Sequence, residues 1–158
     1  MLLALRNTVS GERNDQQWSV AQRSTKIKNM LINNELLDQV TAAAKDSERL
    51  RMNYNFHEAM DSKAQRLLNA LEQGTILPVH RHPATAETYI LLRGKIRVMF
   101  YDDAKNETAS FDLDPLKGEY GVNIPAGQWH TLEVLESGSV IFEVKDGPYT
   151  PLGSADLL

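Results

Sequence analysis

Three side chains of types that bind metal ions lie close together near the middle of the chain: His80, His82 and Glu87. Side chains two residues apart in an extended strand point to the same face, so both imidazoles can face one point about 7 Å along the strand. Pro83 cannot donate a hydrogen bond to a sheet and fits a turn, which would bring Glu87 back beside the histidines. A fourth candidate, His130, follows a Pro-x-Gly turn at the start of another predicted strand. These residues predict a site for one divalent metal ion.

The spacing of these residues resembles the cupin superfamily, whose first motif is written G(x)5HxH(x)3-4E(x)6G. Every position of that motif is satisfied, by Gly74, His80, His82, Glu87 and Gly94. Five fixed positions coincide by chance on the order of once in several million start points. The resemblance implies an all-β fold, the cupin jelly-roll barrel.

The second cupin motif, G(x)5PxG(x)2H(x)3N, is matched in part, by Pro125, Gly127 and His130. Gly118 lies one residue too far upstream, and Val134 replaces the final Asn. These departures concern the geometry of the loop, and His130 keeps its place as the fourth ligand.

Three imidazoles and one carboxylate form a mixed nitrogen and oxygen site that suits Fe, Mn, Ni, Cu or Zn, so the residues leave the identity of the metal open. If the ion is six-coordinate, two positions remain for water or for an oxygen ligand such as a hydroxy acid, a keto acid or a diol. A purely structural ion usually has a closed shell. The donor set therefore favours a site for chemistry or for sensing.

The elements that must position these ligands are mostly strands. Short segments with strand patterning alternate with turn residues and cover 66–71, 75–79, 87–93, 95–101, 108–113, 120–124, 130–135 and 139–144. Many short strands indicate a sandwich or barrel, and the cupin resemblance selects the jelly roll. Upstream, apolar residues recur at helical spacing after the cap residue Asn34, which predicts an amphipathic N-terminal helix over about residues 35–47 on the outside of the barrel.

A polar row precedes the barrel: Arg51, Asn53, Asn55 and His57 alternate with apolar residues. If the segment is extended, the row is either the solvated face of an edge strand or part of the wall of a ligand cavity. Tyr89 has the parity of Glu87 and is expected to face inward as a packing residue.

A closer resemblance joins this row to the end of the chain. The pattern Arg-x-Asn-x-Asn-x-His, the cupin motifs and Lys145-Asp-Gly-Pro-Tyr149-Thr-Pro together resemble the WbuC-type cupin metalloproteins over about residues 30–151. That resemblance implies an association with bacterial surface polysaccharide gene clusters and no established reaction. It favours the cavity, with His57 as a candidate catalytic residue and with candidate substrate-binding residues Arg51, Asn53, Asn55, Lys145 and Tyr149. A solvated Lys145 and a purely structural Tyr149 remain the alternatives.

Composition limits the possible number of domains, the possible partners and the possible location of the protein. The chain has 158 residues, of which 42% are hydrophobic and 24% charged, as expected for one globular domain. The net charge of -4 gives no basic surface for nucleic acid, and the absence of cysteine removes disulfides and thiolate metal sites. The apolar run at 1–5 is too short to span a membrane, which predicts a cytoplasmic protein.

The expected organisation is an N-terminal extension without periodicity at 1–29, a helix and polar strand at 30–66, the barrel at 67–151 and a tail at 152–158. An outward strand face that includes Met99 and Tyr101 indicates a homodimer. Two functions fit these observations. One is a metal-dependent enzyme of the isomerase, lyase or dioxygenase type that acts on a small oxygenated ligand such as a sugar or sugar acid, for which the resemblance implies a setting in surface polysaccharide biosynthesis. The other is a non-catalytic metal-dependent binding protein.

Overall fold

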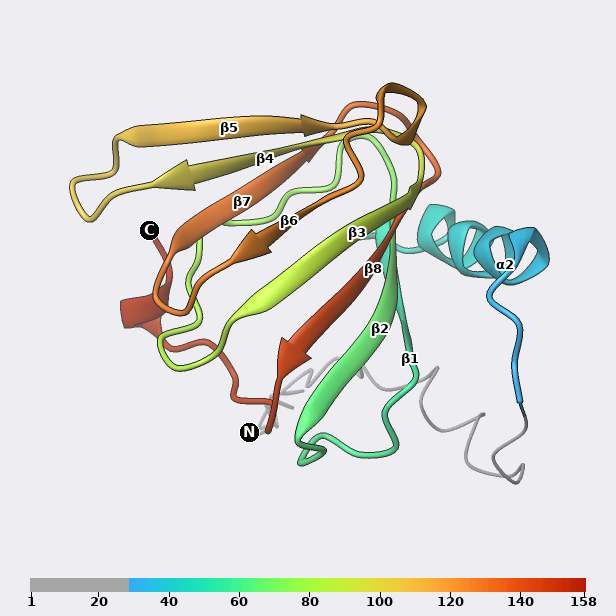
Figure 1. The fold of residues 1–158 in the computed structure, drawn as a ribbon, viewed down its shortest axis with the longest axis horizontal. Coiled ribbons are helices and arrows are strands. Elements are labelled where there is room, and N and C mark those ends of the chain that lie inside the picture. Colours follow the sequence, from blue (N-terminus) through green and yellow to red (C-terminus); the bar gives the residue numbers. More distant parts are fainter. Residues whose placement is uncertain (1–28) are drawn as a thin grey trace, which may run out of the picture.

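Two antiparallel sheets face each other in the computed structural model, which describes residues 29–158 (Figure 1). The predicted extension at 1–29 therefore lies, except for its last residue, outside the described residues. The larger sheet has the order β1-β2-β8-β3-β6, formed by Arg51–Asn55, Ala64–Leu71, Ser139–Asp146, Glu87–Arg93 and Gly121–Ile124. The smaller sheet has the order β5-β4-β7, formed by Glu107–Leu113, Ile96–Tyr101 and Trp129–Val134. Helix α2, Asn34–Lys45, precedes β1, and two short 3-10 helices, Pro115–Lys117 and Ser154–Asp156, complete the elements.

Alternation of side chains along the strands builds the core between the sheets. In β4, Ile96, Val98 and Phe100 are buried, and the residues between them are half-buried on the outer face. In β3, Tyr89 and Leu91 are buried and pack in the same cluster. Each such side chain contributes about 1.5–3 kcal/mol by leaving water. The prediction of an all-β jelly roll is confirmed.

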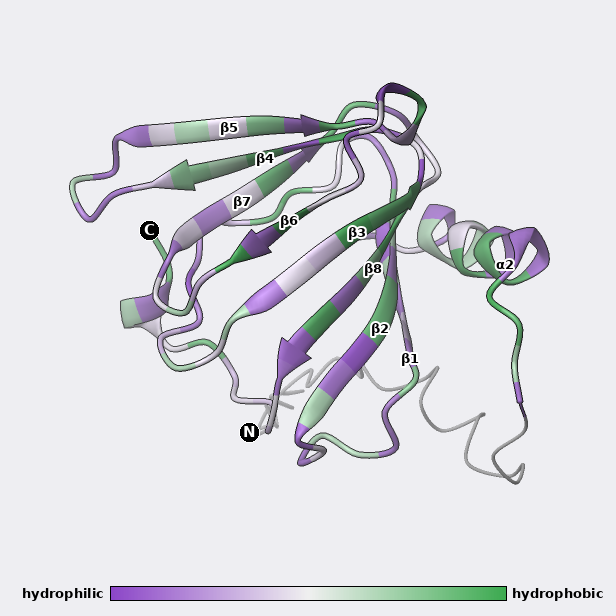
Figure 2. Ribbon diagram, in the orientation of Figure 1, coloured by the Kyte–Doolittle hydropathy of each residue, from purple (hydrophilic) through white to green (hydrophobic). Residues whose placement is uncertain are grey.

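Helix α2 covers the outer face of the larger sheet. Its apolar stripe, which includes Leu37 and Val40, packs against Tyr54 of β1, Leu68 of β2 and Val140 of β8. Figure 2 shows that the helix carries both apolar and polar residues, as an amphipathic helix does. The predicted N-terminal helix is therefore confirmed.

The start of the helix differs by one residue from the prediction. The N-cap is Asn33, whose side chain accepts a hydrogen bond from the backbone N–H of Leu36 at 3.2 Å, and Asn34 is the first helical residue. Either Asn is chemically suited to this position, and the extended backbone of Asn33 decides between them.

The strand expected at 75–79 does not form. Pro78 has no N–H for a ladder, and side chains take the carbonyl oxygens of this segment. Arg51 Nη1 donates to Ile76 O at 2.6 Å, and Thr131 Oγ1 donates to Leu77 O at 2.7 Å. The segment is thus held as an extended connection, with one β-bridge at its end between His80 and His130.

Strand β1 is an edge strand whose register places its polar row on the inner face of the sheet. It pairs with β2 so that Asn53 lies opposite Asn69 and Asn55 opposite Leu67. Tyr54, between them, faces α2. Because successive side chains alternate, the packing of Tyr54 under the helix directs Asn53 and Asn55 toward the barrel interior.

We predict that Gly94→Ala destabilises the fold more than Gly118→Ala. Both glycines have a left-handed backbone, with φ of +85° and +83°, which costs a side chain about 1–2 kcal/mol. A Cβ at Gly94 would lie 2.2 Å from Ser139 Oγ and 2.6 Å from Ser139 Cα, whereas none of the described residues lies within 4 Å of a Cβ at Gly118. Overpacking should add about 1–3 kcal/mol at Gly94 alone. Urea unfolding measures both, and equal losses would contradict the steric account.

Candidate metal centre

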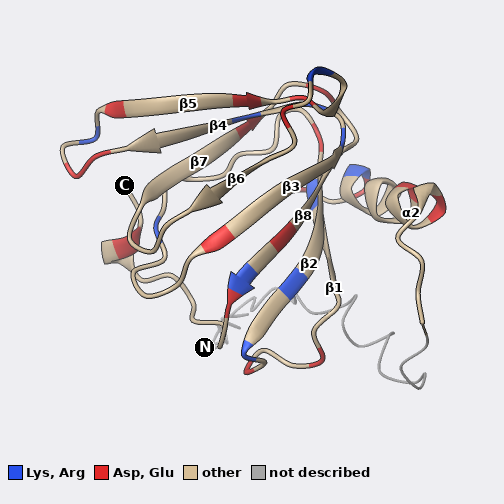
Figure 3. Ribbon diagram, viewed as in Figure 1, with Lys and Arg blue, Asp and Glu red and all other residues tan. Residues whose placement is uncertain are grey.

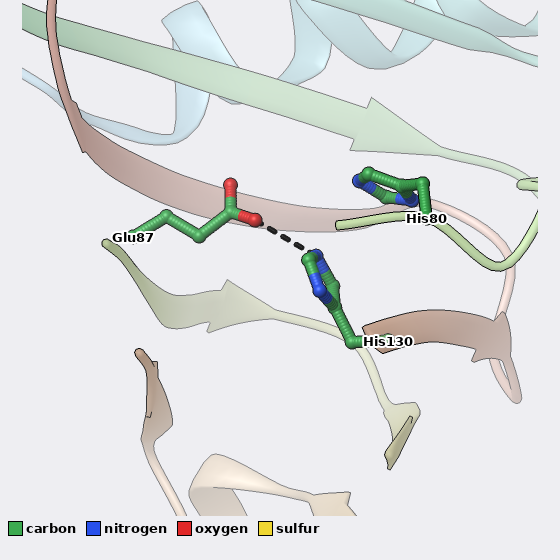
Figure 4. A group of neighbouring side chains, drawn as sticks. All are labelled: His80, Glu87 and His130. Atoms are coloured by element: carbon green, nitrogen blue, oxygen red, sulfur yellow. Dashed lines mark ion pairs between the residues drawn. The ribbon is translucent and has the colours of Figure 1, made fainter. Parts of the chain in front are cut away.

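Residues from two regions far apart in the sequence meet inside the barrel. His80 lies in the connection between β2 and β3, Glu87 begins β3, and His130 lies in β7 of the opposite sheet. One potential ligand atom from each lies within 4.8 Å of the other two (Figure 4). Glu87 Oε1 is 2.7 Å from His130 Nε2, and both side chains are almost fully buried, at 2% and 1% exposure.

His82 borders this cluster without belonging to its tightest part. Its Nε2 lies 3.6 Å from Glu87 Oε1, and its ring centroid is 5.2 Å from that of His80. The structure thus brings all four predicted ligands together, with His82 on the more exposed side.

Hydrogen bonds orient two of the imidazoles. His80 Nδ1 lies 3.0 Å from Pro78 O, and His130 Nδ1 lies 2.9 Å from Gln128 O. A carbonyl oxygen only accepts, so each Nδ1 carries the proton and each Nε2 keeps its lone pair. Backbone carbonyls commonly fix metal-binding histidines in this way.

The contact between Glu87 and His130 indicates whether a metal ion suits this cluster. When His130 is neutral, with its proton on Nδ1, both its Nε2 and the carboxylate Oε1 are acceptors, and they lie 2.7 Å apart. Glu87 Oε1 is buried and has no hydrogen-bond partner of acceptable geometry among the residues that the structure describes. Two adjacent ligands of an ion at 2.1 Å would be about 3 Å apart. A shared metal ion therefore accounts for the separation and for the orphaned oxygen.

Protonation states also suit a metal site. Burial lowers the pKa of His82 to about 4, so this imidazole is neutral at pH 7. Burial alone would raise the pKa of Glu87, but the contact with His130 and the nearby His82 and Lys145 lower it to about 2. Metal ligands must be deprotonated, and both groups meet that requirement.

A cavity of about 270 Å³ opens from this cluster. It lies at the low end of the volume range for small-molecule sites. The ten residues predicted as ligands or as substrate-binding and catalytic candidates all line it: Arg51, Asn53, Asn55, His57, His80, His82, Glu87, His130, Lys145 and Tyr149. His57 is anchored through Nδ1, which lies 3.1 Å from both the backbone N and the carbonyl O of Arg66, so its tautomer decides whether it accepts or donates.

Several residues that line the cavity were not predicted from the sequence, and among them Glu143 matters most for the chemistry of the site. It lies in β8, is 8% exposed, and its Oε1 is 3.8 Å from Lys145 Nζ. Burial, followed by the charge of Glu87, raises the pKa of Glu143 to about 7. Figure 3 shows charged residues on the neighbouring strands β2, β8 and β3. The sequence could have indicated this, because Glu143 has the same strand parity as the buried Ile141 in an otherwise apolar segment and is therefore expected to face inward.

Tyr89 is buried, as its parity predicted, but it is more than a packing residue. Its hydroxyl lies 3.4 Å from His130 Nε2, and its ring lines the cavity. Burial raises the pKa of Tyr89 well above its ordinary value, so the phenol stays protonated and can donate.

Outside the barrel, Arg81 links the ligand segments. It stands between His80 and His82, and its Cζ lies 4.4 Å from the centre of the Trp129 ring. Its Nη1 is 3.6 Å from Asp103, and its Nε is 3.5 Å from Asp156. Trp129 Nε1 also donates to Asp103 at 2.9 Å. We call Arg81, Asp103, Trp129 and Asp156 the outer clamp.

The C-terminal tail supports the same segment through its backbone. Arg81 N donates to Asp156 O at 3.1 Å, and Leu158 N donates to Val79 O at 2.9 Å. Residues 79–81 are therefore flanked by β7 on one side and by the tail on the other. The clamp and the tail together restrict the backbone that presents His80 and His82.

Comparison with solved structures identifies the fold. The capsular polysaccharide assembling protein CapF from Staphylococcus aureus matches with a TM-score of 0.54 and 20% identity, over 66% of this chain and 30% of CapF. KdgF from Halomonas sp. matches with a TM-score of 0.50 and 15% identity, over 63% of this chain and 82% of KdgF. The Schizosaccharomyces pombe Cnp3 cupin domain has a TM-score of 0.50 and 11% identity, over 63% and 66% of the two chains. The protein has the cupin fold, and its His-Glu-His cluster fits a metal-binding cupin.

A family model also matches the sequence and defines a smaller group of proteins than the cupin fold does. A family model described as a domain of unknown function, DUF6016, matches residues 32–113, and the chain belongs to that family. No curated protein matches the chain. Within the described residues, no helix has the length and apolar character needed to cross a membrane.

We predict that His80→Ala, His82→Ala and His130→Ala each lower metal content strongly, because the loss of one of four ligands opens the shell to water and to competing chelators. Elemental analysis of protein purified without chelators measures this. His57→Ala is the matched control, since His57 lines the cavity outside the cluster and should leave metal content unchanged. Equal metal content in the wild type and in His82→Ala would contradict the four-ligand site.

We predict that Arg81→Ala weakens metal affinity about tenfold, since partners that orient ligands typically contribute 10–100-fold. Arg97→Ala is the control, because Arg97 Nε pairs with Asp112 at 2.7 Å on the outer face of the small sheet, and its contact with β7 is an ion pair with Glu133 at 3.8 Å on that same outer face. Competition with a fluorescent chelator measures the affinity. An equal effect of the two substitutions would show that the outer clamp contributes only general stability.

Proposed function

We propose that this protein binds one divalent metal ion through His80, His82, Glu87 and His130, and that the ion and the cavity together take a small oxygenated ligand such as a sugar or sugar acid. The observation that carries the proposal is the buried Glu87 oxygen, which lies among imidazole nitrogens without a hydrogen-bond partner among the described residues. The position of this cluster in the wall of a polar cavity adds a place for the ligand.

The donor set suits Fe, Mn, Ni, Cu or Zn. Four protein ligands in a six-coordinate shell leave two positions, enough for two oxygens of one ligand. A bound ion would act as a Lewis acid that polarises a ligand oxygen or lowers the pKa of a bound water. The protein residues then have distinct tasks. Asn53 and Asn55 supply amide hydrogen bonds to the ligand, and the hydroxyl of Tyr89 donates a hydrogen bond toward the cluster.

Proton transfer has two candidate groups in the cavity. His57 lies at the rim, where its Nδ1 is engaged by the backbone of Arg66, so that Nε2 is the nitrogen left to exchange a proton. Glu143 is buried deeper, with a pKa of about 7. A carboxyl with a pKa near the working pH is suited to general acid and base catalysis. The presence of His57 and Glu143 in the lining of the same cavity as the metal cluster supports an enzyme of the isomerase, lyase or dioxygenase type, and a non-catalytic binding protein is the alternative.

The wider setting is proposed from resemblance. The chain resembles WbuC-type cupins in its motifs. It also shares its fold with a part, 30%, of CapF, a capsular polysaccharide assembling protein that has been crystallised with the inhibitor 3-isopropenyl-tropolone. Both support a role in surface polysaccharide biosynthesis. We also propose a homodimer through the outer face of β4, where Met99 and Tyr101 are half-buried on the monomer.

We predict that ligand binding depends on the metal and on His57 separately. Sugar acids and sugars should raise the melting temperature of metal-loaded protein, and removal of the metal by a chelator should abolish that shift. His57→Ala should keep the metal and the melting temperature of the free protein, yet lose turnover or ligand binding. Ligand shifts that persist in chelator-treated protein would contradict the proposal.

A further inference from the structure

We propose that the mouth of the cavity carries a second subsite, in which Met60, Tyr149 and Leu152 pack against a second sugar ring, so that the ligand is the end of an oligosaccharide and not a free monosaccharide. This inference rests on the function proposed above and narrows it to a ligand of at least two sugar residues. It is carried by the place of the three side chains, by the hydrogen bonds that hold them and by the size of the cavity.

Three apolar side chains that remain exposed gather around the cavity. Met60, Tyr149 and Leu152 are 48%, 43% and 37% exposed, and all three line the cavity. Single exposed apolar residues are common on protein surfaces, but a group of them at the edge of a pocket is typical of a binding surface. We call these three residues the apolar rim.

The strand register places the apolar rim at the end of the larger sheet that carries the metal cluster. In β8, Lys145 lies opposite Gln65 of β2 on one side and opposite Glu87 of β3 on the other. Met60 belongs to the loop that leads into β2, and the other two rim residues belong to the segment that leaves β8, at the same end of the sheet (Figure 1). A ligand held at the metal can therefore extend over the rim without crossing the cavity.

Hydrogen bonds join the two segments that present the apolar rim. Tyr149 N donates to Met60 O at 2.8 Å, and the buried Gln65 side chain donates from Nε2 to the same oxygen at 3.2 Å. Gly147 N also donates to Lys63 O at 2.7 Å. A surface that is fixed before the ligand arrives loses less conformational entropy on binding.

The ring of Tyr149 offers a flat surface at the mouth. Lys145 Nζ lies over the ring, 6.0 Å from its centre, which is within the range of a cation–π contact and helps to orient the ring. The exposed part of the Tyr149 side chain is available to a ligand. A sugar suits such a surface, because the hydroxyl groups of a pyranose leave from the edge of its ring and the faces of the ring carry C–H groups.

The size and polarity of the cavity explain why the apolar rim suits a longer ligand. A volume of about 270 Å³ takes about one monosaccharide, since sites for drug-sized molecules measure roughly 300–1,000 Å³. Further inside, Asn53, Asn55 and Asn69 line the cavity with amides that suit hydroxyl groups. A single sugar would be held by these polar groups and would leave the apolar rim in water, whereas a second residue would cover it.

The test measures, by calorimetry on full-length metal-loaded protein, whether a second residue increases the affinity. Each probe pair consists of a sugar acid and the same acid with one more residue: D-gluconate with maltobionate, D-gluconate with lactobionate, and D-galacturonate with digalacturonate. In at least one pair the longer member should bind about tenfold more tightly, the upper end of what an aromatic contact contributes.

Substitutions in the apolar rim test where the gain in affinity arises. Tyr149→Ala should bring the ratio of the two affinities close to one, and Leu152→Ser should lower it in part. Tyr149→Trp keeps an aromatic face and should preserve the ratio. Tyr120→Ala is the matched control, because Tyr120 is 59% exposed outside the cavity lining, and it should keep the wild-type ratio. Thermal melting checks that each variant is folded.

Other outcomes overturn the inference in distinguishable ways. Equal affinities within every pair, or a ratio that Tyr149→Ala leaves unchanged, refute the second subsite while the metal-dependent function stands. Tighter binding of octyl β-D-glucuronide than of every disaccharide acid would show that the rim takes an apolar chain instead of a sugar. A dimer that Tyr149→Ala converts to a monomer in size-exclusion chromatography would show that a second copy of the chain covers the rim. If metal-loaded protein binds no member of any pair, the sugar ligand of the proposed function is refuted as well, and protein that retains no metal refutes the metal site itself.

Discussion

The burial of one carboxylate, that of Glu87, is the constraint on which the site depends. An ionised carboxylate removed from water costs several kcal/mol unless charges and hydrogen-bond donors surround it. At 2% exposure Glu87 has His130 at 2.7 Å and His82 at 3.6 Å, with Lys145 opposite it in the next strand. His80 and His130, each held through Nδ1 by a backbone carbonyl, turn Nε2 toward the cluster when neutral, so a cation is a partner that suits this arrangement. The raised pKa of Glu143 follows from the same burial, because two neighbouring carboxylates resist carrying charge together.

The jelly roll makes this burial possible by joining two sheets at the cluster. Glu87 belongs to the larger sheet and His130 to the smaller one, while His80 bridges to His130 through the backbone. Backbone hydrogen bonds in both directions, at 3.0 and 2.8 Å, hold that bridge. The ligand geometry is therefore tied to the packing of the two sheets, and the outer clamp and tail secure the one ligand segment that has no strand of its own.

Local spacing was sufficient to predict that the four proposed ligands lie together, because the cupin motif encodes strand parity and turn positions over short distances. Parity likewise predicted the buried faces of β3 and β4. The prediction of a strand at 75–79 was wrong. Pro78 has no N–H to donate, and the side chains of Arg51 and Thr131 hydrogen-bond to the carbonyl oxygens that a neighbouring strand would otherwise use, which the sequence pattern does not reveal. Glu143 and the outer clamp were missed for a related reason. Their importance comes from spatial neighbours that are far away in the sequence, such as Glu87 for Glu143 and Asp156 for Arg81.

The register in which β1 pairs with β2 determines both the polarity of the cavity and the packing of the helix. Tyr54 packs under α2, so Asn53 and Asn55 must face inward. A slip of one residue would place Tyr54 in the cavity and both amides beneath the helix, where each unpaired polar group costs about 1–3 kcal/mol. The apolar stripe of α2 therefore fixes which side chains the cavity presents. The helix holds this edge strand in register, and that is how the amides stay on the inner face of the sheet without apolar packing of their own.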